Sequence, residues 1–367
     1  MIIEIKDNLL TKLDSKLVTG AEIDGLNSLA LSRKRGLNFI IGSRDVLSKL
    51  AESSLLSSES KAIFRHIYNE QTRWNNLLSQ QRFIVTVCGT GLELTSFTQN
   101  DITFLVVPLS KFLTYYLDSK VNVVAEHLRD IRFYKAMVKS YLNNHNISGV
   151  NLSFRHVLGG GSTTFEVVKQ HYIENDGVSI CILDSDLKYP QDDIGATAQK
   201  VLDIIPDSDY SRSLVLSSRE LENIIPFLIF DEVLSHQKYQ SALNKLKTIK
   251  NLTLNNESPI KYVDFKKGVK ISQMNQTGCQ ISKSFWTEVI TLSGLFRECT
   301  SGDCLENAKC NCQIIHGFGS DLLEHCTNHI EEHGFDYNQM DVNIAAEWDY
   351  ICTNLVPYMI APQAQRA

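Results

Sequence analysis

The sequence contains no apolar run as long as the ~18 residues that a membrane-spanning helix needs. Its opening stretch, MIIEIKDNLLTKLDSKL, is charged and amphipathic, and it lacks the apolar core and small-residue cleavage site of a signal peptide. A GxxxxGKS phosphate-binding motif is also absent, so any ATP-driven partner would have to be a separate chain. We therefore expect a protein of the cytoplasm that has no membrane partner.

The overall charge is also small. A formal net charge of -6 over 367 residues does not by itself indicate a nucleic-acid-binding protein. Residues 238–284, however, carry nine lysines against two acidic residues, whereas residues 297–367 carry eleven acidic residues against three basic ones. A basic strip beside an acidic site suits a polyanion that has to reach a bound metal. A solvated, lysine-rich connector would have the same composition, and both interpretations stay open.

Nine cysteines are an odd number for a chain of this length, which argues against a disulfide scaffold. Cys88 and Cys181 lie in apolar runs and are expected to be small core residues. Four others follow the spacing Cys-x4-Cys-x5-Cys-x-Cys, which suits a tetrahedral structural zinc site in a reducing compartment. Unliganded structural cysteines and redox chemistry are the alternatives. The four are Cys299, Cys304, Cys310 and Cys312.

Hydrophobic residues make up 43% of the chain, enough for a sizeable core, and the length suggests two or three domains. Residues 1–118 contain the apolar runs LNFIIG, RFIVTVC and ITFLVVPL, which predict an N-terminal α/β domain of unknown role. Residues 119–235 alternate strand and helix patterns. Residues 236–367 comprise the lysine-rich connector and a mainly helical C-terminal domain with the cysteine cluster.

The block from residue 119 to 235 has a regular rhythm. Runs rich in β-branched residues predict strands at 121–126, 149–158, 177–186 and 211–218. Periodic apolar patterns predict helices at 128–146, 162–175 and 194–205. Thr163 and Glu166 have the spacing of a capping box at the start of the second helix. This alternation predicts an α/β fold, in which helices cover the faces of a parallel sheet.

Acidic residues stand at the ends of two of these strands. Glu126 ends the first strand, and Asp184 and Asp186 end the third. Ligands bind at the carboxyl ends of the strands in an open parallel sheet, so these acids are expected to meet at one edge. Residues two apart in an extended segment point to the same side, so Asp184 and Asp186 are expected to face one metal ion together. Mg²⁺ and Mn²⁺ prefer carboxylate oxygens as ligands. The alternative is that each acid is a solvated residue at the start of a loop.

These segments resemble a known family. VNVVAEHLRDIRFY resembles the first TOPRIM motif, a strand that ends in glutamate before a helix, and ICILDSD resembles the second, the Asp-x-Asp motif. SSRELENIIP is similar to a segment of overcoming-lysogenization-defect nucleases and of stand-alone TOPRIM effectors in bacterial anti-phage systems. The resemblance covers about residues 119–231. It implies a TOPRIM-like parallel sheet flanked by helices.

The resemblance also implies a catalytic metal site. Asp184 and Asp186 would hold Mg²⁺ or Mn²⁺, which polarises the scissile phosphate and activates an attacking water. Glu126 would ligate the metal or act as general base and acid. Glu222 is expected to complete the metal shell, with Glu220 as the alternative. Both of these glutamates could instead be acids favoured at the start of a helix.

Two basic residues are candidate phosphate contacts, Lys188 and Arg219, and plain surface charge is the alternative for both. Lys188 stands where some family members have a third acid, so the number of catalytic metals, one or two, stays open. His127 replaces the glycine that many members have after the motif glutamate.

The implied function is a metal-dependent endonuclease that hydrolyses phosphodiester bonds of DNA or RNA, including transfer RNA. The resemblance also implies a role in anti-phage defence together with a partner ATPase. Whether the protein is a monomer or an oligomer stays open. One alternative is a primase-like TOPRIM enzyme; a topoisomerase fits less well because no separable tyrosine-bearing domain is present. The other alternative is a non-catalytic, TOPRIM-like module for nucleic-acid binding and assembly, which the departures at His127 and Lys188 keep open.

Overall fold

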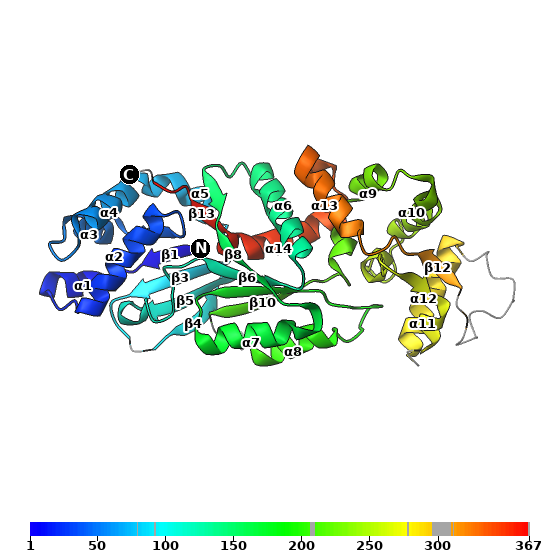
Figure 1. The fold of residues 1–367 in the computed structure, drawn as a ribbon, viewed down its shortest axis with the longest axis horizontal. Helices are drawn as coiled ribbons and strands as arrows, with labels where there is room; N and C mark the ends of the chain where they lie inside the picture. The colour runs from blue at the N-terminus through cyan, green and yellow to red at the C-terminus, as the bar shows by residue number, and fades with distance from the viewer. Residues whose placement is uncertain are drawn as a thin grey trace.

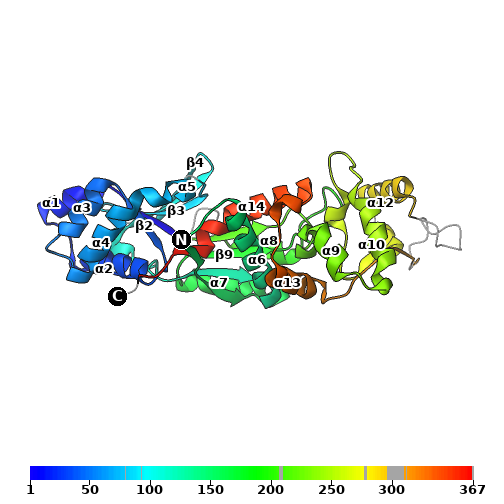
Figure 2. The same ribbon diagram turned by 90° about the horizontal axis from the view of Figure 1, so that it is seen from above.

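The computed structural model describes residues 1–78, 80–91, 93–205, 210–276, 279–295, 310 and 312–365. These residues form an elongated molecule, in which an N-terminal sheet, a central sheet and a smaller, mainly helical region follow one another along the long axis (Figures 1 and 2). No helix in this described part of the chain is long and apolar enough to cross a membrane.

The N-terminal region is built on a five-stranded sheet with the order β2-β1-β3-β5-β4. Neighbouring strands run parallel, except that β4 is antiparallel to β5. The three apolar runs of the sequence form β2, β3 and β5, as predicted. The strands are β1 (Ile2–Ile5), β2 (Phe39–Gly42), β3 (Phe83–Cys88), β4 (Thr95–Gln99) and β5 (Ile102–Pro108). The helices are α1 (Asn8–Ser15), α2 (Gly20–Lys34), α3 (Arg44–Glu52), α4 (Ser58–Glu70) and α5 (Asn75–Leu78).

The sequence of the opening stretch is charged and amphipathic, but its first residues form β1, a strand inside this sheet. Ile2, Ile3 and Ile5 of β1 are buried. The neighbours of β1 are β2 and β3, which come from much later in the chain. The charge pattern of this stretch therefore did not predict that its first residues are buried.

The central region contains a four-stranded, wholly parallel sheet with the order β10-β9-β6-β8. Its strands and helices alternate along the chain, so the expected α/β class with a parallel sheet flanked by helices is confirmed. The strands are β6 (Val121–Ala125), β8 (Phe154–Leu158), β9 (Ser179–Leu183) and β10 (Ser211–Val215). The helices are α6 (Leu128–Asn144), α7 (Thr164–Glu174), α8 (Ala196–Ile204) and the returning C-terminal helix α14 (Val342–Met359).

The two faces of this sheet serve two separate cores, because successive side chains of a strand point to opposite faces. Val124 and Leu183 pack in a small core with Val168 of α7 and Val201 of α8. Val123 belongs to the main core, on the face that α6 and α14 cover. Figure 1 shows α7 and α8 below the sheet and α6 and α14 above it. The buried strands are thereby fixed, and with them the residues at their ends.

Two local predictions in this block need correction. The predicted strand at 149–158 is split at Ser153 into β7 (Val150–Leu152) and β8, since β7 pairs antiparallel with β13 (Ile360–Pro362) at the end of the described chain. The predicted capping box is wrong. Residues 161–163 form a 3-10 turn, and in it the Thr163 hydroxyl donates to the Gly159 and Gly160 carbonyl oxygens instead of capping α7.

The remaining region is mainly helical, and it also contains a two-stranded antiparallel sheet of β11 and β12. It leaves the central sheet through α9 and returns through α13, which packs on both α6 and α9. The helices are α9 (Phe227–Val233), α10 (Gln237–Lys250), α11 (Ile271–Gln276), α12 (Gln280–Ser293) and α13 (Leu322–His333). The strands are β11 (Gly268–Lys270) and β12 (Gln313–His316).

Candidate metal centre

Two of the predicted acids follow neighbouring strands of the central sheet. Glu126 comes directly after β6 and Asp184 directly after β9, and these two strands are paired in parallel. Both side chains are half-buried. Because parallel strands end at the same edge of a sheet, the structure brings these carboxylates to one place.

A glycine turn after β8 holds the backbone beside Glu126. The Gly159 N–H donates a hydrogen bond to the Ala125 carbonyl oxygen at 2.8 Å, and the Gly160 N–H donates to that of Glu126 at 3.1 Å. Gly160 has φ 76°, a left-handed conformation that glycine adopts without strain. The turn therefore continues the hydrogen bonding between β6 and β8 beyond the end of the strands, and it fixes the backbone position of Glu126.

Asp186 lies at the exposed rim of the same edge, and its charge contributes to the raised pKa of Glu126. Its backbone is left-handed, with φ 57°, so the segment after Asp184 is not extended as the same-side argument assumed. Gly195 packs against it: a Cβ atom built there would lie 2.3 Å from Oδ2 of Asp186. The two aspartates thus have unlike surroundings, one half-buried and one in solvent.

The segment after β10 supplies two further acids. Glu220 is 8% exposed, and Glu222, in the 3-10 turn η4 (Leu221–Ile224), is 1% exposed. The Asn223 side chain accepts a hydrogen bond from the Glu220 N–H at 2.9 Å and donates to the carbonyl oxygens of Ile260 and Val263. The turn is therefore fixed to the loop of residues 259–267, and the acids of this turn face that loop.

Asp130, which the sequence analysis did not single out, belongs to the same group of acids. It lies in the first turn of α6, and its Oδ2 atom accepts a hydrogen bond from the His127 N–H at 2.8 Å. Its charge contributes to the raised pKa values of Glu126, Asp184 and Glu222. The signal was in the sequence, because Asp130 stands in the first turn of the helix predicted at residues 128–146, which begins just after Glu126.

Lys266 was also missed, although its ammonium is paired with two acids of the site. Its ammonium nitrogen lies 3.3 Å from Oε1 of Glu222 and 3.9 Å from Oε2 of Glu220. Its charge also acts on Glu126 and Asp184, since it counters the rise of their pKa values. Within residues 238–284 nothing distinguishes this lysine from its eight neighbours.

An ion pair holds the loop that carries Lys266. The Nη2 atom of Arg219 lies 3.0 Å from Oδ2 of buried Asp264, whose Oδ1 atom accepts the Lys267 N–H at 2.7 Å. Arg219, a predicted phosphate contact, is thus already paired. Lys188, the other one, is exposed, and its carbonyl oxygen accepts a hydrogen bond from the Trp286 indole at 3.0 Å.

Burial dominates the electrostatics of the cluster, which consists of Glu126, Asp130, Asp184, Asp186, Glu220, Glu222 and Lys266. Burial raises the pKa of Asp184 well above its ordinary value, and the charges of Glu222, Asp130 and Glu126 add to the rise. Burial likewise raises the pKa of Glu220 to about 7, and Asp264 and Glu222 add to this effect. Ionising Asp184 and Glu220 at neutral pH therefore needs positive charge nearby.

Three carboxylate oxygens bear on whether a metal ion fits here. Both oxygens of Glu222 and Oε2 of Glu220 are buried and receive no hydrogen bond of good geometry from the described residues. Such oxygens are costly to bury unless a cation meets them, and Lys266 does so in part. In the described part of the chain, no three acidic, histidine or cysteine side chains are already spaced to hold a metal ion. The donor set is suitable, but these side chains would have to close around the ion.

The cysteine cluster is only partly described. Cys299 and Cys304 lie outside the described residues, while Cys310 and Cys312 are half-buried just before β12. The Cys312 carbonyl oxygen accepts a hydrogen bond from the Ile271 N–H at 3.1 Å. The structural zinc site therefore stays a prediction. Cys88 and Cys181 are buried core residues, as expected.

No family model, curated protein or solved structure matches this chain. The arrangement of the acidic cluster is therefore the ground on which a function can be inferred.

Proposed function

We propose that residues 119–235 form a TOPRIM-type catalytic domain, and that its acidic cluster binds Mg²⁺ or Mn²⁺ to hydrolyse phosphodiester bonds. The observation that carries this proposal is the convergence of Glu126, Asp184 and Glu222. They follow three different strands of one parallel sheet, and the charges of Glu126 and Glu222 both act on Asp184 at its carboxyl edge. Buried carboxylates repel one another, so their collection at one place calls for a cation.

A hard divalent cation is the ligand that this donor set suits best. Carboxylate oxygens are the ligands that Mg²⁺ and Mn²⁺ prefer, and both oxygens of Glu222 are free of good hydrogen bonds in the described residues. When bound, such an ion polarises a phosphate and lowers the pKa of an attacking water. Asp184 and Glu222 would hold it, with Asp186 reaching it from the rim.

The other residues of the site suit a phosphodiester. Glu126 is half-buried and has a raised pKa, and in this proposal it would take a proton from the attacking water. Lys266 could move from its carboxylate partners to a phosphate oxygen, and exposed Lys188 could hold the chain next to it. The surplus of lysines in residues 238–284 favours a polyanionic substrate, DNA or RNA, including transfer RNA.

A second candidate function rests on Lys266 itself. Its ammonium already neutralises part of the cluster, so the fold can stand without a metal. In that case the region would be a non-catalytic, TOPRIM-like module that binds nucleic acid. The roles in anti-phage defence and with a partner ATPase rest on resemblance in the sequence and stay predictions.

A nuclease assay separates the two functions. The full chain is incubated with Mg²⁺ or Mn²⁺ and, in turn, plasmid DNA, total RNA and transfer RNA. We expect at least one substrate to be cut, and the nearly isosteric variants Glu126→Gln and Asp184→Asn to reduce the rate about a hundredfold or more. The control variant is Asp203→Asn, which changes an exposed acid on α8. If no substrate is cut, or if all variants cut alike, the nuclease proposal is wrong.

A further inference from the structure

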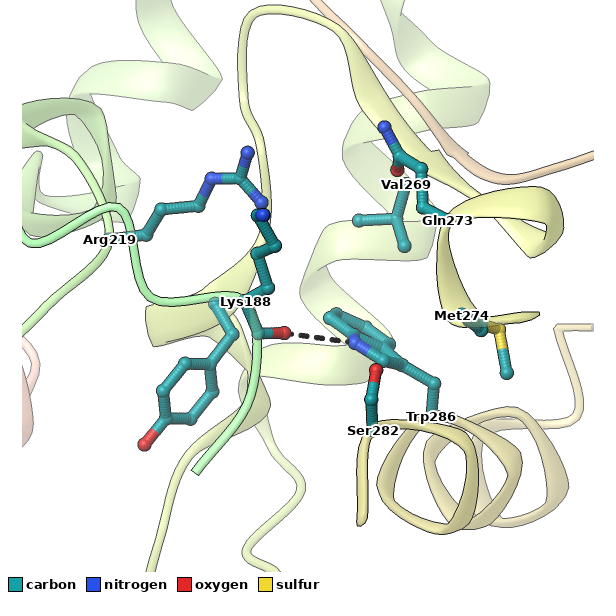
Figure 3. A pocket seen from close by; sticks show the side chains of 8 residues that line it. Lys188, Arg219, Val269, Gln273, Met274, Ser282 and Trp286 are labelled. Carbon is teal, nitrogen blue, oxygen red and sulfur yellow. Dashed lines mark hydrogen bonds between the residues drawn. The ribbon is translucent and has the colours of Figure 1, made fainter. Parts of the chain in front are cut away.

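A cavity of about 290 Å³ lies between the central sheet and the C-terminal region. One wall comes from the segments after β9 and β10, which contribute Lys188 and Arg219, and the other from β11, α11 and α12 (Figure 3). A volume at the lower end of the range for small-molecule sites suits one ring-sized group rather than a long stretch of ligand.

The cavity has an apolar floor and a polar rim. Val269, Met274 and Trp286 are almost fully buried and line the floor. At the rim, Gln273 is exposed, and its Oε1 atom accepts the Lys270 N–H at 3.1 Å, which leaves its amide nitrogen available to a ligand. A flat heterocycle with polar edges would match such a site, because its faces are apolar while its edges need hydrogen-bond partners.

Two cations converge on one side of this cavity. Figure 3 shows the ends of the Lys188 and Arg219 side chains drawn toward each other above the indole of Trp286. The Nε atom of Arg219 is buried and has no hydrogen-bond partner among the described residues, and the Lys188 ammonium has no ion pair there. Asp264 neutralises part of the Arg219 charge, so the unpaired Lys188 ammonium is the group that most favours a further anion on this side of the cavity.

The cavity also borders the acidic cluster. Arg219 lines the cavity, while its Nε atom lies 3.8 Å from Oε1 of Glu220. The Oε2 atom of Glu220 in turn lies 3.9 Å from the Lys266 ammonium nitrogen. A ligand phosphate held by Arg219 would therefore be next to the place where we propose that phosphodiester bonds are cut.

We propose that this cavity binds one nucleotide, with its base on the Val269–Met274–Trp286 floor and its phosphate at Lys188 and Arg219. The proposal rests on the proposed function in one respect: it identifies the nucleotide as part of a substrate strand, beside the phosphodiester that is hydrolysed. A free mononucleotide has the same chemistry and is the other source. An unpaired base is required, since a base inside a duplex cannot enter a cavity of this kind.

Binding without metal tests this inference independently of hydrolysis. In EDTA, the full chain is titrated against a fluorescein-labelled thymidine decamer and against a decamer of the same backbone whose bases are all missing. Both probes carry the same phosphates, so the ratio of their Kd values measures the contribution of the bases. We expect the thymidine decamer to bind about tenfold more tightly. Equal Kd values would overturn the proposal, whether or not the protein proves to be a nuclease.

Variants locate the base contact. Val269→Phe fills the floor and Gln273→Ala removes the rim amide, and each should bring the ratio of Kd values close to one. Gln199→Ala, at an exposed glutamine on α8, is the matched control and should leave the ratio unchanged. Gln273 is exposed, so its variant remains informative if Val269→Phe fails to fold. A ratio that Gln273→Ala and a folded Val269→Phe both leave unchanged would contradict the proposal.

Competition with thymidine monophosphate distinguishes the two sources. Displacement of the decamer at a concentration near the decamer's own Kd would identify a free nucleotide as the ligand. Displacement only at concentrations at least a hundredfold higher would identify a strand, because only a strand gains the additional phosphate contacts of the lysine-rich region. Either result supports a nucleotide site, provided that the thymidine decamer outbinds its base-free counterpart.

Discussion

The Lys266 ammonium lies 3.3 Å from Oε1 of Glu222, a carboxylate that is 1% exposed. The pair joins two segments 44 positions apart in the chain, the turn after β10 and the loop before β11. Glu222 and its acidic neighbours raise the pKa of Lys266 despite its partial burial. The lysine is thus a built-in cation that stands among the groups that we propose to bind a divalent metal.

Replacing Lys266 by methionine should have opposite effects on metal binding and on turnover. Loss of the cation leaves Glu222 unpaired, so the free energy of unfolding in EDTA should fall by about 1–2 kcal/mol, a figure reduced because Lys266 is partly exposed. Mn²⁺ should bind about tenfold more tightly, since no ammonium competes with it. Phosphodiester hydrolysis should nonetheless slow down. Urea titration, calorimetric titration and the nuclease assay measure the three effects.

Lys267→Met is the matched control for this experiment. Lys267 is the exposed neighbour in the same loop, and no ion pair joins its side chain to another described residue. Its loss should leave the stability within about 0.5 kcal/mol of the wild type. If the two variants bind Mn²⁺ alike, Lys266 does not compete with the metal.

The effect of Mg²⁺ on thermal stability should depend on pH. Glu220 has a pKa of about 7 in the folded protein against an ordinary value of 4.5. A carboxyl with a raised folded-state pKa stabilises the fold when protonated, so this contribution is complete below pH 4.5 and is lost as the pH rises through 7. Glu220 lies beside Glu222 in the acidic cluster, and its ionised form adds to the negative charge that attracts the metal. Saturating Mg²⁺ should raise the Tm by about 2–5 °C at pH 8 and by less at pH 6.

Differential scanning fluorimetry with NaCl at matched ionic strength serves as the control for that shift. Asp184→Asn should show no specific Mg²⁺ effect at either pH. Equal shifts at pH 6 and pH 8 in the wild type would mean that the ion binds elsewhere.

The Arg219–Asp264 pair is expected to be the main structural support of the site. Asp264 is buried, accepts the Lys267 N–H and pairs with Arg219 at 3.0 Å, so Asp264→Ala removes the nearest partner of a largely buried guanidinium. Urea unfolding should show a loss of about 3 kcal/mol. The exposed pair of Asp231 and Lys247 provides the comparison, because Asp231→Ala should cost under about 0.5 kcal/mol. Similar losses for both variants would refute this support role.

Gly195→Ala should move Asp186 without unfolding the protein. The added Cβ atom would lie 2.3 Å from Oδ2 and 2.7 Å from Cβ of Asp186, so the aspartate has to shift. If Asp186 reaches the metal from the rim, hydrolysis should fall about tenfold while the free energy of unfolding changes by about 1 kcal/mol. At Gly20 an added Cβ meets nothing within 4 Å, and Gly20→Ala is the control. Unchanged hydrolysis in Gly195→Ala would exclude Asp186 from the site.

The strands of the central sheet could be predicted because their signal is local. Runs such as VNVVA and SICIL are buried on both faces, and the acids that follow them, Glu126 and Asp184, meet as the parallel topology requires. The prediction that Asp184 and Asp186 lie in an extended segment and point to the same side was less accurate. The left-handed backbone of Asp186 accompanies a hydrogen bond from its own N–H to the Arg219 carbonyl oxygen, a contact between two strand ends that no local pattern shows.

The residues that the sequence did not reveal owe their roles to contacts distant in the chain. Lys266 is one lysine among nine until the Asp264 ion pair brings its loop against Glu222. The pairing of β7 with β13 likewise joins segments about two hundred positions apart. Asp130 is different, since its place in the first turn of the helix that begins just after Glu126 could have been predicted from the sequence.

Titration of Mn²⁺, followed by electron paramagnetic resonance of the free ion, tests the central claim most directly. The acidic cluster should bind at least one Mn²⁺ per chain at neutral pH, and Mg²⁺ should displace it. Asp184→Asn should abolish this binding, whereas Asp203→Asn, at an exposed acid on α8, should not alter it. Wild-type protein that binds no Mn²⁺, or Asp184→Asn protein that binds it as well as the wild type, would contradict the assignment of a metal centre.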